Sequence, residues 1–518
     1  MPRKISPCSL MQVCLQSIAG NMDKLWCKDY EKNFGGKGLV LYTLGPFEYM
    51  DNEMIQGVID NLTKSQRLRR IHLDLLITSR LRRLHIQLPP TIPISPVIKM
   101  VAYRCQHLVE LSLFLGSGKW SSKSQSTKHS SLLMELVQGL PNITYLNFSE
   151  SSCGDDVLAT IALFCKKIKV LKVKGCPVTD LGLKNLCLDS ENDKKCHYLH
   201  TLDVTRTAAT TTGLAEVIDK LENLQFLYHD DTGLPLWHLN GWEYQQGVVE
   251  PKNKKYKLQT LKCHFPDEHI TFDESVAMFD IFYRYCPFLT TVYLVNPPSN
   301  EALLCLSNLR LKDLTLACDS GSSLITFNGG ICPLLQKVGH TLEKLALGDI
   351  NRIDVGVIGL HCRNLLHLQL DFYDLSEVHL DFTSSETLVC QNDIKPFTKI
   401  QSINCRIEGI SIGDFSYVLQ SLLSGCASLK SLSLHHLDSF SDNLLQEVLL
   451  CNKMQDLEEL YLTSCDNVSG NVIEDLLRND NQLCKMELIN CKHVYRRHIE
   501  NMLMYIKRNK FDVTLKWL

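Results

Sequence analysis

The chain has 518 residues, too many for one compact core but not for a repeat array, in which each unit contacts only its neighbours. Its formal net charge of −3 gives no indication of a nucleic-acid or anionic-membrane partner. No stretch approaches the roughly 18 apolar residues of a membrane span, and the polar N-terminus lacks the apolar run of a signal peptide, so we expect a cytoplasmic or nuclear protein.

The first predicted element is a helix over residues 7–26. Ser9 is a favourable N-cap, and Gln12 three residues later completes a capping box. The apolar positions of residues 50–62 predict a second helix. Residues 1–65 are therefore expected to form a helical N-terminal region.

A short pattern lies within the first helix. Ser9 is followed by Leu10, with Cys14 four residues later and Ile18 after four more, and the last three share one stripe of the helix. The pattern resembles the BC-box by which substrate receptors dock on the elongin B–elongin C adaptor. The resemblance implies that Leu10 fills an adaptor pocket with Cys14 beside it, which requires an exposed Leu10. The alternative is a helix that only caps the apolar end of the repeats.

The sequence does not identify a cullin. A cullin-2 box would follow the BC-box as an apolar residue, Pro, and apolar residues three and seven positions after that Pro. Pro46 is preceded by Gly45 and followed at these offsets by Tyr49 and Glu53, so one of the three apolar positions is met. The opening Leu-Pro and the downstream Trp of an F-box also have no counterparts in residues 1–70.

Residues 66–518 are predicted to form a solenoid, because the hexad Leu-x-x-Leu-x-Leu recurs from Leu81 to Leu483. Counting copies with other apolar residues, the spacing averages about 29 residues, within the range of leucine-rich repeats. We expect an α/β horseshoe with about 13 to 15 parallel strands on its concave side, one per hexad. The hexads without substitution are Leu108/Leu111/Leu113, Leu311/Leu314/Leu316, Leu342/Leu345/Leu347, Leu365/Leu368/Leu370, Leu429/Leu432/Leu434 and Leu457/Leu460/Leu462.

Cysteines follow the same period. Six of them stand three residues before the first apolar position of a hexad: Cys105, Cys165, Cys196, Cys286, Cys362 and Cys426. This phase predicts buried, reduced and unpaired thiols in the core. It resembles the cysteine-containing leucine-rich repeats of F-box substrate receptors and their relatives. With a BC-box-like helix ahead of the repeats, the chain resembles zygote-defective-eleven-like receptors of elongin–cullin ubiquitin ligases.

Long insertions interrupt the repeats. Residues 116–131 are rich in Ser and Lys and are predicted to be a loop. Residues 371–396 are longer than the usual connection between the strands of neighbouring repeats. The insertion over residues 228–257 contains Trp237 and Trp242, which would be natural anchors for a protein partner if exposed at a loop tip. The alternative is that both indoles pack on the convex side.

The strand positions between the core residues are predicted to face the concave surface. They are polar, carry both charge signs and include scattered aromatic residues, a composition typical of protein-binding surfaces. The aromatic candidates for partner binding are Tyr145, Phe226, Tyr228 and Tyr293.

No catalytic motif accompanies the repeats: the sequence contains no His-Glu-x-x-His, Gly-x-Ser-x-Gly or helix-opening Gly-x-Gly-x-x-Gly. We therefore expect no enzyme, and no cofactor or metal site. The interpretation that the resemblance favours is the substrate-recognition subunit of a cullin-RING ubiquitin ligase, with elongin B, elongin C, a cullin and a protein substrate as partners. The alternative is a non-enzymatic scaffold or adaptor protein of the same fold.

Overall fold

The computed structural model describes residue 2 and residues 9–34, 46–114, 123–187, 196–245, 254–265, 272–319, 325–350, 352–372, 380–381, 396–408 and 415–518. The chain forms two compact units. The N-terminal unit comprises residues 7–260, and the C-terminal unit comprises residues 261–518 together with residues 1–6. Among the described residues, no helix combines the length and the apolar character needed to cross a membrane.

The N-terminal unit begins with helices. Ser9 Oγ accepts a hydrogen bond from the Gln12 backbone N–H at 3.2 Å, and the Gln12 side chain accepts one from the Ser9 N–H at 3.0 Å, so the predicted capping box is confirmed. The helices that precede the first strand are α1 (Leu10–Met22), the π-turn η1 (Asp23–Cys27), α2 (Lys28–Phe34), the 3₁₀-turn η2 (Pro46–Tyr49), α3 (Asn52–Lys64) and α4 (Arg70–Leu76).

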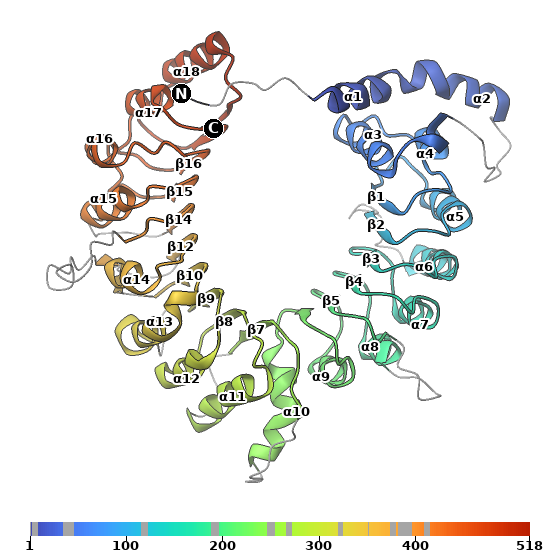
Figure 1. Ribbon diagram of the computed structural model, residues 1–518, viewed down its shortest axis with the longest axis horizontal. Helices are drawn as coiled ribbons and strands as arrows, with labels where there is room; N and C mark the ends of the chain where they lie inside the picture. Colours follow the sequence, from blue (N-terminus) through green and yellow to red (C-terminus); the bar gives the residue numbers. More distant parts are fainter. Residues whose placement is uncertain are drawn as a thin grey trace. The chain divides into compact units, whose positions relative to one another are not determined.

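Six parallel strands follow, hydrogen-bonded in sequence order. They are β1 (Arg83–Gln87), β2 (Glu110–Phe114), β3 (Tyr145–Asn147), β4 (Val170–Lys172), β5 (Thr201–Asp203) and β6 (Phe226–Tyr228). Figure 1 shows the helices on one face of this sheet: α5 (Ile94–Arg104), α6 (Lys123–Gln138), α7 (Asp155–Phe164), α8 (Asp180–Cys187), α9 (Thr211–Lys220) and α10 (Gly233–Gln245). The opposite face, here called the open face, carries the side chains between the buried leucines.

The C-terminal unit repeats this arrangement with a ten-stranded parallel sheet. Its strands are β7 (Thr260–His264), β8 (Thr291–Val295), β9 (Asp313–Ala317), β10 (Lys344–Gly348), β12 (His367–Phe372), β14 (Ser402–Ile407), β15 (Ser431–His435), β16 (Glu459–Thr463), β17 (Lys485–Ile489) and β18 (Thr514–Trp517). Its helices are α11 (Phe272–Tyr285), α12 (Asn300–Leu304), α13 (Cys332–Val338), α14 (Val355–His361), α15 (Ser416–Gly425), α16 (Asp442–Cys451), α17 (Gly470–Arg478) and α18 (Arg496–Asn509). A short pair, β11 (Ile353–Asp354) and β13 (Leu380–Asp381), lies apart from this sheet.

The predicted α/β leucine-rich repeat fold is confirmed, since each hexad supplies a strand and the hexad leucines pair in constant register. Leu111 faces Leu146 on β3, which in turn faces Leu171 on β4. The strands form two sheets rather than the one sheet expected. The last strand, β18, was not predicted, because the first apolar position of its hexad is occupied by Asp512.

A tight turn recurs at the end of the strands. The residue two positions after the last core position of the hexad has φ between 50° and 66° in eight repeats: Glu150, Gly175, Arg206, Asn296, Asp349, His436, Ser464 and Asn490. The N–H of this residue donates a hydrogen bond to a carbonyl of the next repeat; the Ser464 N–H, for example, donates to the Ile489 carbonyl at 2.8 Å. The left-handed conformation, which costs energy in any residue but Gly, is thus held by the bond to the next repeat.

The six repeat-phased cysteines are buried and form no disulfide, as predicted. Their thiols reach backbone carbonyls, for example Cys105 Sγ to the Thr78 oxygen at 3.4 Å and Cys426 Sγ to the Leu422 oxygen at 3.1 Å. Burial raises the pKa of Cys105 and of Cys426 to about 12. These thiols are therefore core groups, unreactive while the fold is intact.

The turn before α8 joins three consecutive helices. Asp155, at the start of α7, accepts hydrogen bonds from the Thr179 N–H at 2.8 Å and the Thr179 hydroxyl at 2.6 Å. Asp180, at the start of α8, does the same for Thr210 before α9. Gly182 leaves room for the first carboxylate, because a Cβ there would lie 2.3 Å from Asp155 Oδ1.

Gly182→Ala is accordingly expected to lower the free energy of unfolding by about 1–3 kcal/mol, since the new methyl group displaces Asp155 from Thr179. Gly20→Ala in α1 is the matched control, because a Cβ at Gly20 meets nothing within 4 Å. That substitution should stabilise by about 0.5–1 kcal/mol through helix propensity. Urea denaturation measures both changes. Equal effects of the two substitutions would contradict the contact assigned to Gly182.

Candidate functional site

Helix α1 is held on the N-terminal unit by one of its faces. Ala19 and Met22 are buried. Leu15 packs on α3 opposite Gly57, where a Cβ would come within 2.7 Å of Leu15 Cδ1. The helix is therefore a fixed part of the unit, and one face remains available to other molecules.

Another face of α1 is exposed and carries apolar side chains. Leu10 is 81% exposed and Val13 is 48% exposed, while Met11, in line with the packed Leu15 and Ala19, is 42% exposed. Cys14 is exposed as well, whereas Ile18, at the edge of the packed face, is half-buried. Leu10 and Cys14 thus lie together on a free surface, and neither fills the end of the repeat array.

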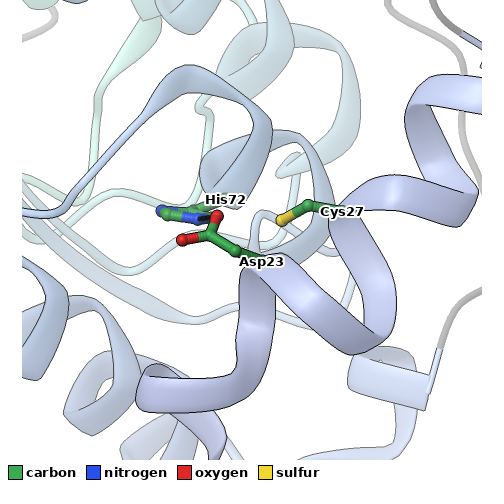
Figure 2. Close-up of side chains that lie close together, drawn as sticks. All are labelled: Asp23, Cys27 and His72. Atoms are coloured by element: carbon green, nitrogen blue, oxygen red, sulfur yellow. Dashed lines mark hydrogen bonds and ion pairs between the residues drawn. The ribbon is translucent and has the colours of Figure 1, made fainter.

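The π-turn η1, which follows α1, is fixed to α4 by a partly buried polar cluster (Figure 2). The Asp23 carboxylate accepts a hydrogen bond from His72 Nε2 at 2.8 Å and pairs with Arg67 at 3.2 Å. It also pairs with Arg69. The Cys27 thiol, one turn after Asp23, lies beside the same carboxylate. A π-turn places an extra residue in a helix, and here it brings both Asp23 and Cys27 to α4.

The protonation states in this cluster follow from burial and hydrogen bonding. Burial by itself raises the pKa of Asp23, but the hydrogen bonds from His72 and Arg69 outweigh it and hold that pKa well below its ordinary value. Burial, and then the Asp23 charge, raise the pKa of Cys27 to about 12. Burial lowers the pKa of His72 despite the bond to Asp23. At neutral pH the cluster therefore contains a carboxylate, a thiol and a neutral imidazole.

The ligand atoms of Asp23, Cys27 and His72 lie within 4.8 Å of one another, a spacing that could hold a metal ion. The hydrogen bonding favours a structural role instead. The Arg69 backbone N–H donates to His72 Nδ1 at 3.2 Å, so the imidazole proton sits on Nε2, the nitrogen that would have to bind the ion. Two guanidinium groups already neutralise the carboxylate. We interpret these residues as a clamp that fixes η1, and with it α1, on α4.

The clamp predicts a dependence of stability on pH. The pKa of His72 is lowered in the folded protein from 6.5, so its contribution to stability is complete above about pH 6.5 and is lost as the pH falls toward the lowered value. The melting temperature should therefore decrease between about pH 7.5 and 5.5. His72→Gln should decrease less over this interval, because the titrating group is absent. An equal decrease in both proteins would contradict the assignment.

The aromatic residues predicted on the strands lie on the open faces. Phe226 and Tyr228, on β6, stack with ring centroids 6.5 Å apart, and Tyr228 is 43% exposed. Tyr145, on β3, is half-buried with Lys172 Nζ 5.7 Å from its ring centre. Tyr293, on β8 of the C-terminal unit, has Lys262 Nζ at 5.3 Å. The structure thus pairs Phe226 with Tyr228, and each of the other two rings with a lysine.

Two predicted insertions are partly helical. Trp237 is half-buried in helix α10, not exposed at a loop tip, and the side chain of Trp242 lies outside the described residues. Residues 123–131 belong to helix α6 rather than to a loop. Most of the insertion over residues 371–396 also lies outside the described residues. The clamp has no signal in the sequence, because Asp23 and His72 are separated by 49 positions and belong to no motif.

Comparison with known proteins gives no family: no protein-family model matches the chain, and no curated protein matches it. Solved structures do match. A chain in the crystal structure of the yeast Rad7 and Elc1 complex is 16% identical over 95% of this chain and 96% of its own length, with a TM-score of 0.45. An internalin from Listeria monocytogenes is 13% identical over 76% of this chain and 94% of its own, with a TM-score of 0.34. Both scores lie below 0.5, so we base the function on the residues of this chain.

Proposed function

We propose that this protein is the substrate-recognition subunit of a cullin-RING ubiquitin ligase in the cytoplasm or nucleus. In this proposal α1 docks on the elongin B–elongin C adaptor, the repeats hold a protein substrate, and the chain contributes no catalytic residue. The cullin that would complete the assembly is not specified by the residues after α1.

The observation that carries the proposal is the exposure of Leu10 on a helix that is otherwise anchored. An apolar side chain 81% in water contributes little to folding, and its burial in a partner's pocket would contribute to binding. Cys14 lies one turn away on the same face, as the BC-box pattern requires. The capping box and the clamp fix both ends of α1, which reduces the entropy that docking would cost.

The packing of Leu15, Ala19 and Met22 also suits a second function, a scaffold protein in which α1 only covers α3. Purification of the tagged full-length protein from cells, with identification of what co-purifies, separates the two functions. Elongin B and elongin C should be recovered in amounts comparable to the tagged protein, and less from a Leu10→Ala variant. Their absence from the wild-type preparation would leave the scaffold function.

A further inference from the structure

The fourth repeat places two lysines, Lys172 and Lys174, on the open face of the N-terminal sheet and a third, Lys169, directly before its strand. Lys169 precedes β4 and is exposed, while Lys172 in the strand and Lys174 after it are half-buried. We call these three residues the lysine strip. Lys172 pairs in register with Asn147 on β3 and with Asp203 on β5, which places it in the interior of the sheet face.

No acidic side chain among the described residues forms an ion pair with the lysine strip. The nearest candidate in register, Asp203, directs its Oδ1 to the backbone N–H of Thr205 at 3.1 Å and to its hydroxyl at 2.8 Å. Lys172 instead lies over the ring of Tyr145. Burial lowers the pKa of His200, and the nearby positive charge of Lys169 lowers it further. The strip is therefore a local excess of positive charge.

Four lysines on the strands of the C-terminal sheet, or directly before them, have acidic partners. Lys312 pairs with Glu343 at 2.8 Å, and Lys430 pairs with Glu458 at 3.8 Å. Glu487 forms ion pairs with two lysines, Lys485 at 3.2 Å and Lys516 at 3.5 Å. These four lysines are thus neutralised by carboxylates, whereas among the described residues the lysine strip is not.

Aromatic rings flank the lysine strip on both sides. Tyr145 lies one strand away on β3, and the stacked pair Phe226 and Tyr228 lies two strands away on β6. With neighbouring strands about 4.8 Å apart, the rings and the ammonium groups lie within reach of one short peptide segment. Such a surface offers charge pairing at its centre and apolar contacts at its edges.

We infer that the lysine strip, with Tyr145 and the Phe226–Tyr228 pair, binds an acidic segment of a protein partner. Carboxylates of the segment pair with Lys169, Lys172 and Lys174, and its aromatic or aliphatic side chains contact the rings. A nucleic acid fits less well, because the net charge of the chain is −3 and three lysines are few for a phosphate backbone. The inference deepens the proposed function by naming a substrate class, and it rests on that function for the consequence of binding.

The test uses the full-length protein and a phage-displayed library of random peptides. Peptides retained by the wild-type protein should be enriched in Asp and Glu relative to the unselected library. A fluorescent copy of the most enriched peptide should bind K169E/K172E about tenfold more weakly or worse, and its affinity for the wild-type protein should fall as salt rises from about 0.05 to 0.3 M. The matched control is K166E/K167E, which makes the same charge change at exposed residues between α7 and β4 and should bind like the wild-type protein.

A library that yields no binder, or binders without an acidic excess, would overturn the inference. So would equal losses in the two variants, or displacement of the peptide by oligothymidine, which would indicate a nucleic-acid surface. Elongin B–elongin C capture is measured on the same variants and should not change. If the wild-type protein captures elongin B–elongin C but binds no acidic peptide, only the lysine strip is contradicted. If it binds the acidic peptide but captures no elongin B–elongin C, only the adaptor docking is contradicted.

Discussion

Replacing Leu10 and Cys14 together by alanine is expected to weaken adaptor binding at least about thirtyfold and to leave the melting temperature nearly unchanged. A buried leucine anchor in an interface contributes about 2 kcal/mol or more, so its loss alone raises the Kd roughly thirtyfold. Leu10 is 81% exposed and Cys14 is exposed, so neither side chain contributes much to the core. The expected change in the free energy of unfolding is within about 0.5 kcal/mol. Titration with elongin B–elongin C and thermal denaturation measure the two quantities.

The control for that variant lies on the packed face of the same helix. Met22 is fully buried, so Met22→Ala should cost about 2–5 kcal/mol and lower the melting temperature by several degrees. The Leu10→Ala/Cys14→Ala protein could melt as low as Met22→Ala while the wild-type protein captures no elongin C. That result would favour the scaffold function, in which α1 only covers α3.

The largest effect on stability is expected from the hexad itself. Leu171, on β4, is fully buried and pairs in register with Leu146 and Leu202. Leu171→Ala should therefore lower the free energy of unfolding by about 2–5 kcal/mol, through lost burial and the cavity that remains. Because each repeat is stabilised by its neighbours, the effect should spread beyond the substituted repeat, which hydrogen exchange at β3 and β5 would detect.

Lys167→Ala, in the exposed turn before β4, is the control for this substitution and should stay within about 0.5 kcal/mol of the wild-type protein. A cost below about 1 kcal/mol for Leu171→Ala would contradict the core position of the hexad.

The repeat fold could be predicted from the sequence because it is encoded locally. The spacing of Leu81 through Leu483 determines which side chains face the helices, and a strand one residue out of register would expose every core leucine. The burial of the six cysteines could be predicted for the same reason, because each occupies the same position in its repeat. Where a single apolar position is missing, as at Asp512 before β18, the pattern fails although the strand still forms.

The features that escaped prediction depend on contacts distant in sequence or on inserted elements. Helix α10 lies between two repeats and carries no clear apolar stripe, so the sequence does not show that Trp237 lies in a helix. The clamp joins Asp23 to His72, and neither residue has a local pattern that predicts the other. The BC-box pattern requires Leu10 to be exposed, but it does not show which face of the helix packs on the rest of the protein. The exposure of Leu10 was therefore known only from the structure.

The central claim is tested most directly by titrating the purified full-length protein with purified elongin B–elongin C in a calorimeter. Docking through an anchored, exposed Leu10 predicts a 1:1 complex with a Kd of about 1 μM or tighter for the wild-type protein. It predicts a Kd at least about thirtyfold higher for Leu10→Ala/Cys14→Ala. No heat with the wild-type protein, or equal affinity for the wild-type and variant proteins, would contradict the claim.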